Sequence, residues 1–304
     1  MGPVLVECVP NFSEGRRLEV VRALEQAIAS VEGVAVLDTH WDPDYHRCVI
    51  TFAGEPQAVA RAAFLGVAEA VRRIDLREHR GSHPRIGAAD VVPLVPLRGI
   101  TLAELVPIAR ALGERIWREL GVPVFLYGEA ASSPERRELS FVRRGNFEGL
   151  PRAMQENPAR WPDFGPPRVH PTAGATAVGV RPPLIAYNVD LDTPDLEVAR
   201  AVARRVRESG GGLPGVRAIG VKLSSGHTQV SVNLLDYRTT PLHRVLERVK
   251  EEAERFGARV TGSEIVGLVP EEALWQCAEH YLGLRGFGPG KVLERRLAEV
   301  AWGR

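Results

Sequence analysis

The chain has 304 residues, of which 44% are hydrophobic and 25% are charged. These proportions are typical of globular proteins, and they exclude collagen, coiled coils and long disorder. Lysine and arginine together number 39 and aspartate and glutamate 38, so the net charge is +1. This balance argues against a nucleic-acid coat or a polybasic membrane anchor, and at about 150 residues per domain the length suggests two domains.

Targeting and redox features indicate a cytoplasmic protein. No apolar run approaches the roughly 18 residues that span a bilayer, and residues 1–7 lack the pattern of a secretory signal peptide. The three cysteines, Cys8, Cys48 and Cys277, are far apart in the sequence and form no CxxC pair. We therefore expect buried thiols in a reducing compartment, without a disulfide framework or a thiolate zinc site.

The apolar periodicity of the first half predicts alternating strands and helices. The predicted elements in chain order are a strand over residues 4–9, a helix over 18–31, strands over 34–37 and 48–52, a helix over 56–74 and a strand over 91–95. Polar loops are expected over residues 38–46 and 77–86. The order strand–helix–strand–strand–helix–strand is the split βαβ arrangement of ferredoxin-like domains. A helix over residues 102–120 and a strand over 122–127 extend this half.

The middle of the chain has a different composition. Residues 132–183 are rich in Pro, Gly and Arg and have weak periodicity, and the prolines at 162, 166 and 167 exclude a helix interior there. Long stretches without regular structure in compact proteins are commonly functional. We therefore expect an ordered loop that lines a site.

The second half repeats the order of the first. Its predicted elements are a strand over residues 184–191, a helix over 196–206, a hairpin of strands over 218–223 and 230–234, a helix over 242–256 and a strand over 260–266. Two closing helices are expected over residues 271–282 and 291–302. The predicted fold is α+β, with two ferredoxin-like (split βαβ) subdomains, residues 1–180 and 181–304, and the crevice between them is the expected place for a site.

Two polar clusters are candidates for chemistry. The first, residues 78–87 (EHRGSHPRIG), joins a helix to a strand and carries two histidines, and histidine is the natural acid or base at neutral pH. A solvated loop with incidental histidines is the alternative. The second, residues 38–47, contains side chains of metal-ligand types: His40, Asp42, Asp44 and His46. Because these side chains have no recognised ligand spacing, a polar contact surface for a ligand is favoured over a metal-dependent hydrolase.

Longer motifs connect these clusters along nearly the whole chain. They read VECVPNFSEG over residues 6–15, HR over 46–47, TF over 51–52, HRGSHPRIGA over 79–88, RGNFEGL over 144–150, PDFGP over 162–166, AGA over 173–175 and SEIVGLVP over 263–270. In this order they resemble the formiminotransferase family. Its better-known members transfer the formimino group of N-formimino-L-glutamate to tetrahydrofolate.

The resemblance implies a fold, cofactors and partners. It implies two ferredoxin-like subdomains around a substrate tunnel, in a homodimer, with tetrahydrofolate as co-substrate. In the animal enzymes a cyclodeaminase domain follows, so we expect the transferase alone here and a separate cyclodeaminase as a further partner. Small-molecule substrates are expected, without nucleic acid or membrane. No metal or redox cofactor is expected, because the oxidation level of the transferred carbon does not change.

The resemblance also assigns residues. The catalytic histidine of the family falls on His83. Its folate-binding segment falls on Pro162, Asp163, Phe164, Gly165, Pro166, Pro167, Arg168, Val169, His170 and Pro171. Familiar members have aspartate at the position of His40 and commonly asparagine at the position of His46. These differences leave open an enzyme of the same fold that acts on 5-formyltetrahydrofolate, by formyl transfer or cyclisation.

The chemistry of formimino transfer requires further side chains. The attacking 5-nitrogen of tetrahydrofolate loses a proton and the departing glutamate nitrogen gains one, and a single histidine can do both in turn. A cationic intermediate calls for a carboxylate, for which Asp38 and Glu148 are candidates. Substrate carboxylates call for arginine forks and polar contacts. The candidates for these contacts are His40, His46, Arg47, Arg85, Arg144 and Arg181.

The pterin ring calls for a polar edge contact and a stacking partner. Asp163 is the candidate for the edge, and Phe164 or Tyr187 for the face. Each has a plain structural alternative, as a turn residue or as part of an apolar core. A non-catalytic folate- or nucleic-acid-binding module also stays open, although the sequence has no aromatic-rich RNA-binding strand.

Overall fold

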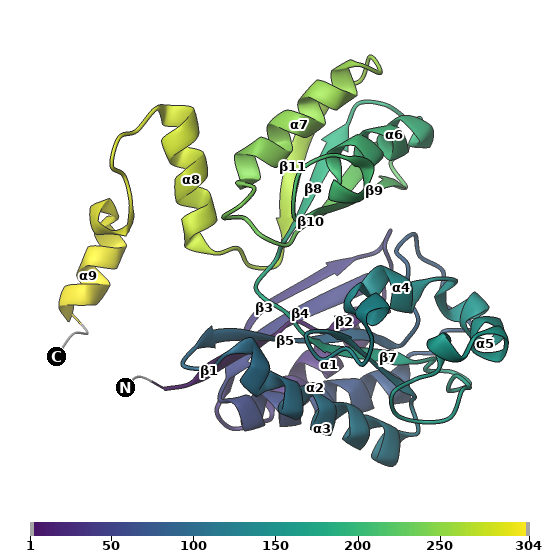
Figure 1. Cartoon of the computed structure of the whole chain (residues 1–304). Coiled ribbons are helices and arrows are strands. Elements are labelled where there is room, and N and C mark those ends of the chain that lie inside the picture. The colour runs from purple at the N-terminus through teal and green to yellow at the C-terminus, as the bar shows by residue number, and fades with distance from the viewer. Residues whose placement is uncertain (1–2, 302–304) are drawn as a thin grey trace. The chain divides into compact units, whose positions relative to one another are not determined.

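The computed structural model describes residues 3–301, with side chains through residue 297. The chain forms two units, Met1–Pro182 and Pro183–Arg304. Each unit has its own sheet (Figure 1). Each also has its own apolar core. No helix among the described residues is both long enough and apolar enough to cross a membrane.

The N-terminal unit begins with the predicted strand–helix–strand–strand–helix–strand order. Its elements are β1 (Leu5–Cys8), β2 (Asn11–Phe12), α1 (Leu18–Ala29), β3 (Val34–Asp42), β4 (Arg47–Gly54), α2 (Pro56–Arg73) and β5 (Ala89–Arg98). Strands β1 and β2 share one position in the sheet, where both pair antiparallel with β4 on one side and with β5 on the other. Strand β3 pairs with β4 at the edge. This connectivity confirms the α+β, ferredoxin-like prediction for the first half.

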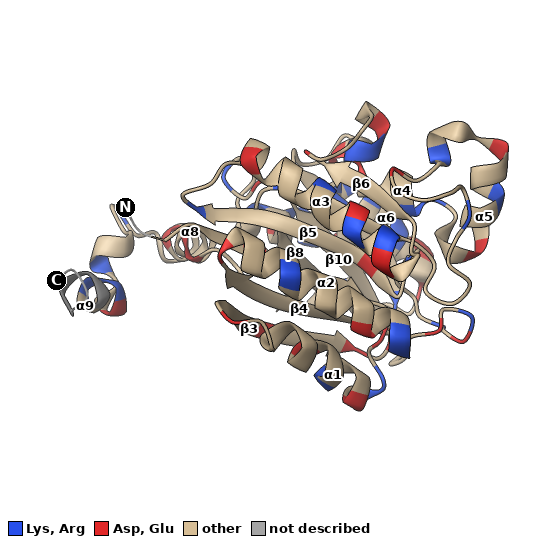
Figure 2. Ribbon diagram, turned by 90° about the horizontal axis from the view of Figure 1, so that it is seen from below, with Lys and Arg blue, Asp and Glu red and all other residues tan. Residues whose placement is uncertain are grey.

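Helices cover one face of this sheet. Figure 2 shows α1, α2 and α3 (Leu102–Leu120) side by side over strands β3, β4 and β5. Helix α1 buries one stripe of apolar residues at the helical period: Val20, Val21, Leu24 and Ile28. Helix α3 begins at a capping box of Thr101 and Glu104 and ends at Gly121, whose φ of 67° lets the chain turn toward the next strand.

Two expectations for this unit are wrong. Residues 38–42 continue strand β3 instead of forming a polar loop. A bulge after Val36 turns Asp38, His40 and Asp42 to the sheet face opposite the helices. Residues 132–183 are also not devoid of regular structure. They contain α4 (Leu139–Arg143), α5 (Asn146–Glu156) and β7 (Thr176–Val180). Strand β7 is buried along its whole length, so its sequence lacks the alternation that reveals a half-buried strand.

Strand β7 enlarges the sheet on the side of β5. It lies parallel to β5 and to β6 (Val124–Gly128). The segment that contains α4 and α5 covers part of the second sheet face, with a separate apolar core of Ile86, Val91, Phe125, Tyr127, Val142, Leu150, Met154, Ala175 and Ala177. Because Ile86 belongs to this core, the loop between α2 and β5 is anchored at its C-terminal end.

The C-terminal unit repeats the split βαβ arrangement. Its elements are β8 (Ile185–Leu191), α6 (Leu196–Val206), β9 (Val216–Lys222), β10 (Thr228–Leu234), α7 (Leu242–Glu254) and β11 (Val260–Val266). The strand order is β11-β8-β10-β9, and all pairs are antiparallel. Helices α8 (Glu271–Leu282) and α9 (Leu293–Ala301) follow. The end of the last predicted helix, at residue 302, lies outside the described residues.

Candidate active site

The loop between α2 and β5 is tied to the turn between β3 and β4. The backbone N–H and the hydroxyl of Ser82 donate to the carbonyl oxygen of Asp44, at 3.2 and 3.1 Å. Nε2 of His79 donates to the carbonyl oxygen of His46 at 2.8 Å. Gly81 permits this approach, since a Cβ there would lie 2.3 Å from the carbonyl oxygen of Tyr45. The first polar cluster is therefore an ordered loop, which we call the His83 loop (residues 77–88).

His83 lies against an arginine of the hairpin turn. Nη1 of Arg47 lies 2.7 Å from Nε2 of His83 and 3.1 Å from Oδ1 of Asn11. A guanidinium can only donate, so Nε2 accepts and His83 is a neutral ring with its proton on Nδ1. Burial, followed by the charges of Arg47 and Arg143, holds the pKa of His83 well below its usual value. The side chain is thus a neutral ring near pH 7.

His79 is a second neutral ring in the same loop. Its Nε2 donates to the carbonyl of His46, and its Nδ1 accepts from Nε of Arg85 at 2.9 Å. Burial lowers the pKa of His79 to about 4. With both ring nitrogens engaged inside the protein, His79 serves the loop's architecture.

His46 occupies the turn itself, in a left-handed backbone conformation with φ of 52°. Its Nδ1 lies 3.0 Å from the carbonyl oxygen of Arg80, and its Nε2 lies 3.1 Å from Oε1 of Glu14. The ring stacks on that of His79, with centroids 4.2 Å apart and planes 8° apart. Both partner atoms are acceptors, so the ring donates from both nitrogens when both hydrogen bonds are formed.

Glu14 is a buried carboxylate in the segment just before α1, with 0% of its surface exposed. Oε1 also accepts from the backbone N–H groups of Gly15, Arg16 and Arg17, at 2.9–3.0 Å, and Oε2 accepts from Nε of Arg17 at 2.6 Å. Burial by itself would raise the pKa of Glu14, but the hydrogen bonds from His46 and from Arg16 and Arg17 outweigh it and hold the pKa well below its usual range. Glu14 is therefore ionised and anchors the hairpin turn.

Arg85 and Glu148 form an ion pair. Arg85 is 8% exposed, and its two terminal nitrogens lie 2.9 and 2.6 Å from the Glu148 carboxylate oxygens. Glu148 lies in the first turn of α5, and its hydrogen bonds with Arg85 lower its pKa. The backbone N–H of Phe147 donates to the carbonyl of Arg85 at 2.9 Å. This pairing brings two predicted site residues, far apart in the sequence, to the end of the His83 loop.

Other predicted residues lie apart from this cluster. Asp38 and His40 pair with Thr51 and Val49, which puts them on the same sheet face as Arg47, further along β3. They are not among the residues that line the hollow beside His83, which are Ser13, Tyr45, His46, Arg47, His79, His83, Arg85 and Asp90. Arg144 is exposed and its guanidinium lies over the ring of Phe141 at 5.4 Å. Arg181 follows β7, and its N–H donates to the carbonyl of Leu94 at 3.2 Å.

The predicted folate-binding segment is held by internal contacts. Oδ2 of Asp163 accepts from the N–H of Leu126 and from Nη1 of Arg136, both at 2.7 Å. Phe164 packs against the helix-side core, and Gly165, with φ of 100°, passes against Trp117. Nδ1 of His170 accepts from the N–H groups of Thr172 and Ala173, at 3.3 and 3.0 Å. Asp163 therefore has a structural role in the loop, and Phe164 is part of an apolar core. Tyr187 is likewise buried in the core of the C-terminal unit.

The second polar cluster, residues 38–47, contains side chains of metal-ligand types, and one of them stabilises the hairpin turn. Oδ1 of Asp42 accepts from the backbone N–H groups of Asp44 and Tyr45, each at 2.8 Å, and so closes the hairpin turn. Among the described residues, no group of three His, Cys, Asp or Glu side chains is arranged to hold a metal ion. Asp42 thus serves the hairpin turn.

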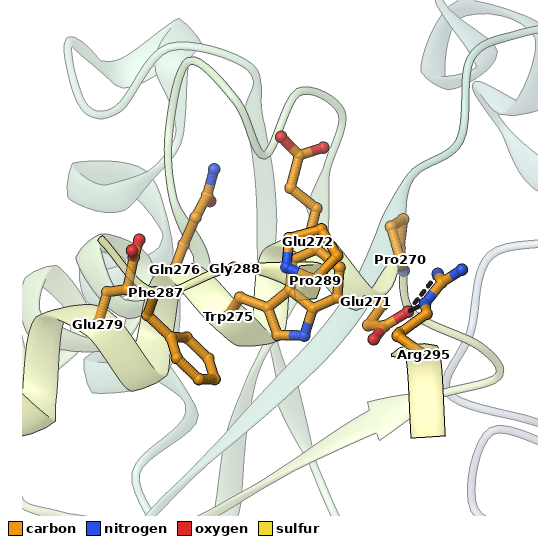
Figure 3. A pocket seen from close by; sticks show the side chains of 10 residues that line it. All are labelled: Pro270, Glu271, Glu272, Trp275, Gln276, Glu279, Phe287, Gly288, Pro289 and Arg295. Atoms are coloured by element: carbon orange, nitrogen blue, oxygen red, sulfur yellow. Dashed lines mark hydrogen bonds and ion pairs between the residues drawn. The ribbon is translucent and has the colours of Figure 1, made fainter. Parts of the chain in front are cut away.

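A second hollow lies in the C-terminal unit, between α8 and the segment before α9 (Figure 3). Trp275 and Phe287 supply its apolar wall, and Glu271 pairs with Arg295 at one end. None of the predicted site residues lines it.

Sequence reasoning assigned no role to two buried acids beside the His83 loop. Glu14 is one. The other is Asp90, which is 2% exposed, accepts from the N–H of Ile86 at 2.8 Å and pairs with Arg143. Their position in or next to the quoted motifs was the only sign in the sequence that they belong to the site. The sequence does not show that they are buried, because their burial depends on segments that are distant in the sequence.

The geometry defines an α+β protein of two split βαβ units, with a neutral histidine held by an arginine at a hairpin turn. Residues 5–181 match the family model described as "Formiminotransferase domain, N-terminal subdomain", and residues 186–286 match the one described as "Formiminotransferase domain". The chain belongs to the formiminotransferase family.

Curated relatives match over most of the chain. Glutamate formimidoyltransferase of Streptococcus pyogenes serotype M1 is 46% identical over 296 residues, which are 96% of this chain and 98% of the relative. The protein of the same name from Thermoplasma acidophilum is 47% identical over 301 residues, or 98% of each chain. Formimidoyltransferase-cyclodeaminase of Rattus norvegicus is 45% identical over 285 residues, which are 91% of this chain and 52% of the rat protein.

Proposed function

We propose that this protein is an enzyme that transfers the formimino group of N-formimino-L-glutamate to the 5-nitrogen of tetrahydrofolate and releases L-glutamate. Identity of 46–47% over nearly the full length of two proteins named glutamate formimidoyltransferase supports this reaction. The structural observation that carries it is the neutral ring of His83, whose Nε2 accepts from Arg47 at 2.7 Å and becomes free to act as a base when the guanidinium turns to a substrate carboxylate.

His83 is the proposed acid and base. The 5-nitrogen attacks the amidine-like carbon of the donor and forms a new N–C bond, and His83 accepts the proton that this nitrogen loses. His83 then gives the proton to the glutamate nitrogen as its bond to the carbon breaks. Proton transfer of this kind contributes about 100- to 10,000-fold to a rate. The low pKa of His83 keeps the ring unprotonated at neutral pH and makes it a strong acid once it has taken up the proton.

Charged groups around His83 are the proposed substrate contacts. Arg47, Arg85, Arg144 and Arg181, with His40, are proposed to bind the carboxylates and polar groups of the two substrates. Asp38 or Glu148 is proposed to stabilise the cationic intermediate. Glu148 has the better support, because its ionised carboxylate lies at the end of the His83 loop. Residues 162–171 are proposed to bind folate, with backbone groups in the leading role because several of the side chains are engaged internally.

We also propose the subdomain bounds, the location, the oligomeric state and a partner of the enzyme. We expect two subdomains, residues 1–180 and 181–304, a cytoplasmic location and a homodimer that size-exclusion chromatography with light scattering would detect. A separate cyclodeaminase is the expected next enzyme. The rat relative, whose name joins both activities in one chain, supports this pairing.

A transfer assay tests the function. Purified protein, tetrahydrofolate and formiminoglutamate are combined, beside His83→Asn, and folate binding is measured for both proteins. Turnover that is lost in the variant without loss of folate binding establishes the proposal. Turnover of 5-formyltetrahydrofolate alone would transfer the function to the alternative reaction. Folate binding without turnover of either compound would refute the proposed reaction.

A further inference from the structure

Given the proposed role of His83, we propose that His46 is a positioning residue, which holds the His83 loop against the hairpin turn and does not bind the donor. The inference rests on how the structure uses this ring. Each nitrogen has a protein acceptor, the ring face is stacked on His79, and the backbone carbonyl accepts from His79 as well. A side chain engaged in this way has no donor group left for a substrate carboxylate.

His46 joins two segments that the chain separates. Through Nε2 it contacts Glu14, which backbone N–H groups fix just before α1. Through Nδ1 it contacts the carbonyl of Arg80, in the His83 loop. The ring therefore links a buried anchor to the loop that carries the proposed base.

The link bears directly on the pair at the proposed reaction centre. Arg47, the next residue along the chain, donates to Nε2 of His83 at 2.7 Å. The dipeptide His46–Arg47 thus holds the loop at two points, the Arg80 carbonyl and the His83 ring. A loop freed at the first point would move His83 relative to Arg47 at the second, and misplacement of a catalytic group by about 1 Å can cost about 100-fold in rate.

Two amide variants separate the two hydrogen bonds of His46. The amide nitrogen of asparagine reaches the position of Nδ1, so His46→Asn keeps the donor to the Arg80 carbonyl and loses the contact with Glu14. The amide nitrogen of glutamine reaches the position of Nε2, so His46→Gln keeps the contact with Glu14 and loses the donor to Arg80. His46→Ala loses both. Asparagine also tolerates φ above zero, while alanine and glutamine share the same backbone strain and form a matched pair.

The experiment compares kcat, KM and thermal unfolding of the intact wild-type chain and the three variants. We expect His46→Ala and His46→Gln to lower kcat by about 10- to 100-fold, with KM for formiminoglutamate and tetrahydrofolate changed by less than about threefold. His46→Asn should restore kcat to within about threefold of the wild type, because the donor to the Arg80 carbonyl returns.

A second readout does not depend on activity. The pKa of His83 is followed by NMR titration in each protein. Loosening of Arg47 should raise it toward the usual value in His46→Ala and His46→Gln, and much less in His46→Asn. A wild type without formimino transfer would refute the proposed function, and the titration would still decide the role of His46.

Two outcomes would overturn the inference. A rise in KM for formiminoglutamate with kcat unchanged would make His46 a substrate contact. Equal effects of all three variants on kcat and on the His83 titration, in step with their melting temperatures, would make it a structural residue without a special link to His83.

Discussion

At the residue scale, the charge of Arg47 tunes His83. The guanidinium lies beside Nε2 and disfavours a second proton on the ring, so the pKa of His83 is lowered by burial and then by this charge. The active form of a general base is the neutral one. Activity should therefore fall as pH drops through the lowered pKa of His83.

Arg47→Gln should shift the fall in activity at acidic pH to a higher pH. Without the cation the pKa of His83 returns part of the way toward 6.5, so a larger fraction of the ring is protonated and inactive at pH 6. The measurement is the midpoint of the pH profile of kcat/KM, which is independent of any loss in the plateau rate. Arg61→Gln, at an exposed position of α2, is the control. An unshifted midpoint would contradict the electrostatic role of Arg47.

Glu14→Gln tests the buried anchor. The pKa of Glu14 is lower in the folded chain than its usual 4.5, so its stabilisation is complete above that value and is lost as pH falls below it. We expect the variant to be less stable by about 3–5 kcal/mol at pH 7, because breaking a buried ionic network leaves partners unpaired. The loss should shrink as the pH of the urea titration is lowered below 4.5.

An exposed pair provides the comparison for Glu14. The carboxylate of Glu119 is 52% exposed and pairs with Arg115, so Glu119→Gln should cost at most about 1 kcal/mol. If Glu14→Gln lost equal stability at pH 7 and at pH 4, hydrogen-bond geometry and not ionisation would account for the anchor.

At the element scale, β7 and the His83 loop depend on a close backbone approach. Gly87 pairs with Gly174, the N–H of Ala88 donates to the carbonyl of Ala173, and the N–H of Ala175 donates to that of Ile86, both at 2.9 Å. A Cβ at Gly87 would lie 1.9 Å from the carbonyl oxygen of Ala175. Only glycine allows the end of the His83 loop to lie against the segment before β7.

Gly87→Ala should therefore destabilise the protein by about 1–3 kcal/mol or more, because the clash is with backbone and not with a flexible side chain. Gly149→Ala is the matched control, since a Cβ there meets nothing within 4 Å. Gly149 lies inside α5, where alanine should stabilise by about 0.5–1 kcal/mol. Denaturant titration measures both, and a neutral Gly87→Ala would show that the segments can separate at no cost.

At the scale of the whole molecule, the chain has separate cores in its two units. Leu94 is fully buried in the core beneath the helices of the N-terminal unit, and Leu234 is fully buried in the core of the C-terminal unit. Each core is made of residues from its own unit, so each has an independent source of stability.

We expect scanning calorimetry to resolve two transitions. Leu94→Ala should lower one of them and Leu234→Ala the other, each by a loss of about 2–5 kcal/mol for a buried leucine. Equal shifts of a single transition by both substitutions would mean that the chain unfolds as one cooperative unit.

Local patterns determined much of this protein. The helices have apolar stripes at the helical period, as in Val20, Leu24 and Ile28, and apolar and polar residues alternate in the C-terminal strands β8 and β10. This periodicity predicted where these elements lie in the chain. The order of elements then indicated two split βαβ units, and the motifs indicated the family. These features are set by residues within a few positions of one another, which is the range that sequence patterns report.

Tertiary structure alone decided the arrangement of the site. Sequence patterns could not show that β7 is a strand, because a strand buried on both faces has no polar residues in alternation. They could not show either that a bulge after Val36 changes the face on which the following residues of β3 lie. They also could not show that Glu14, His46 and Arg80 meet, since a hairpin turn, a helix start and a loop converge there. Burial and charge state come from such long-range contacts, which keep the ring of His83 neutral.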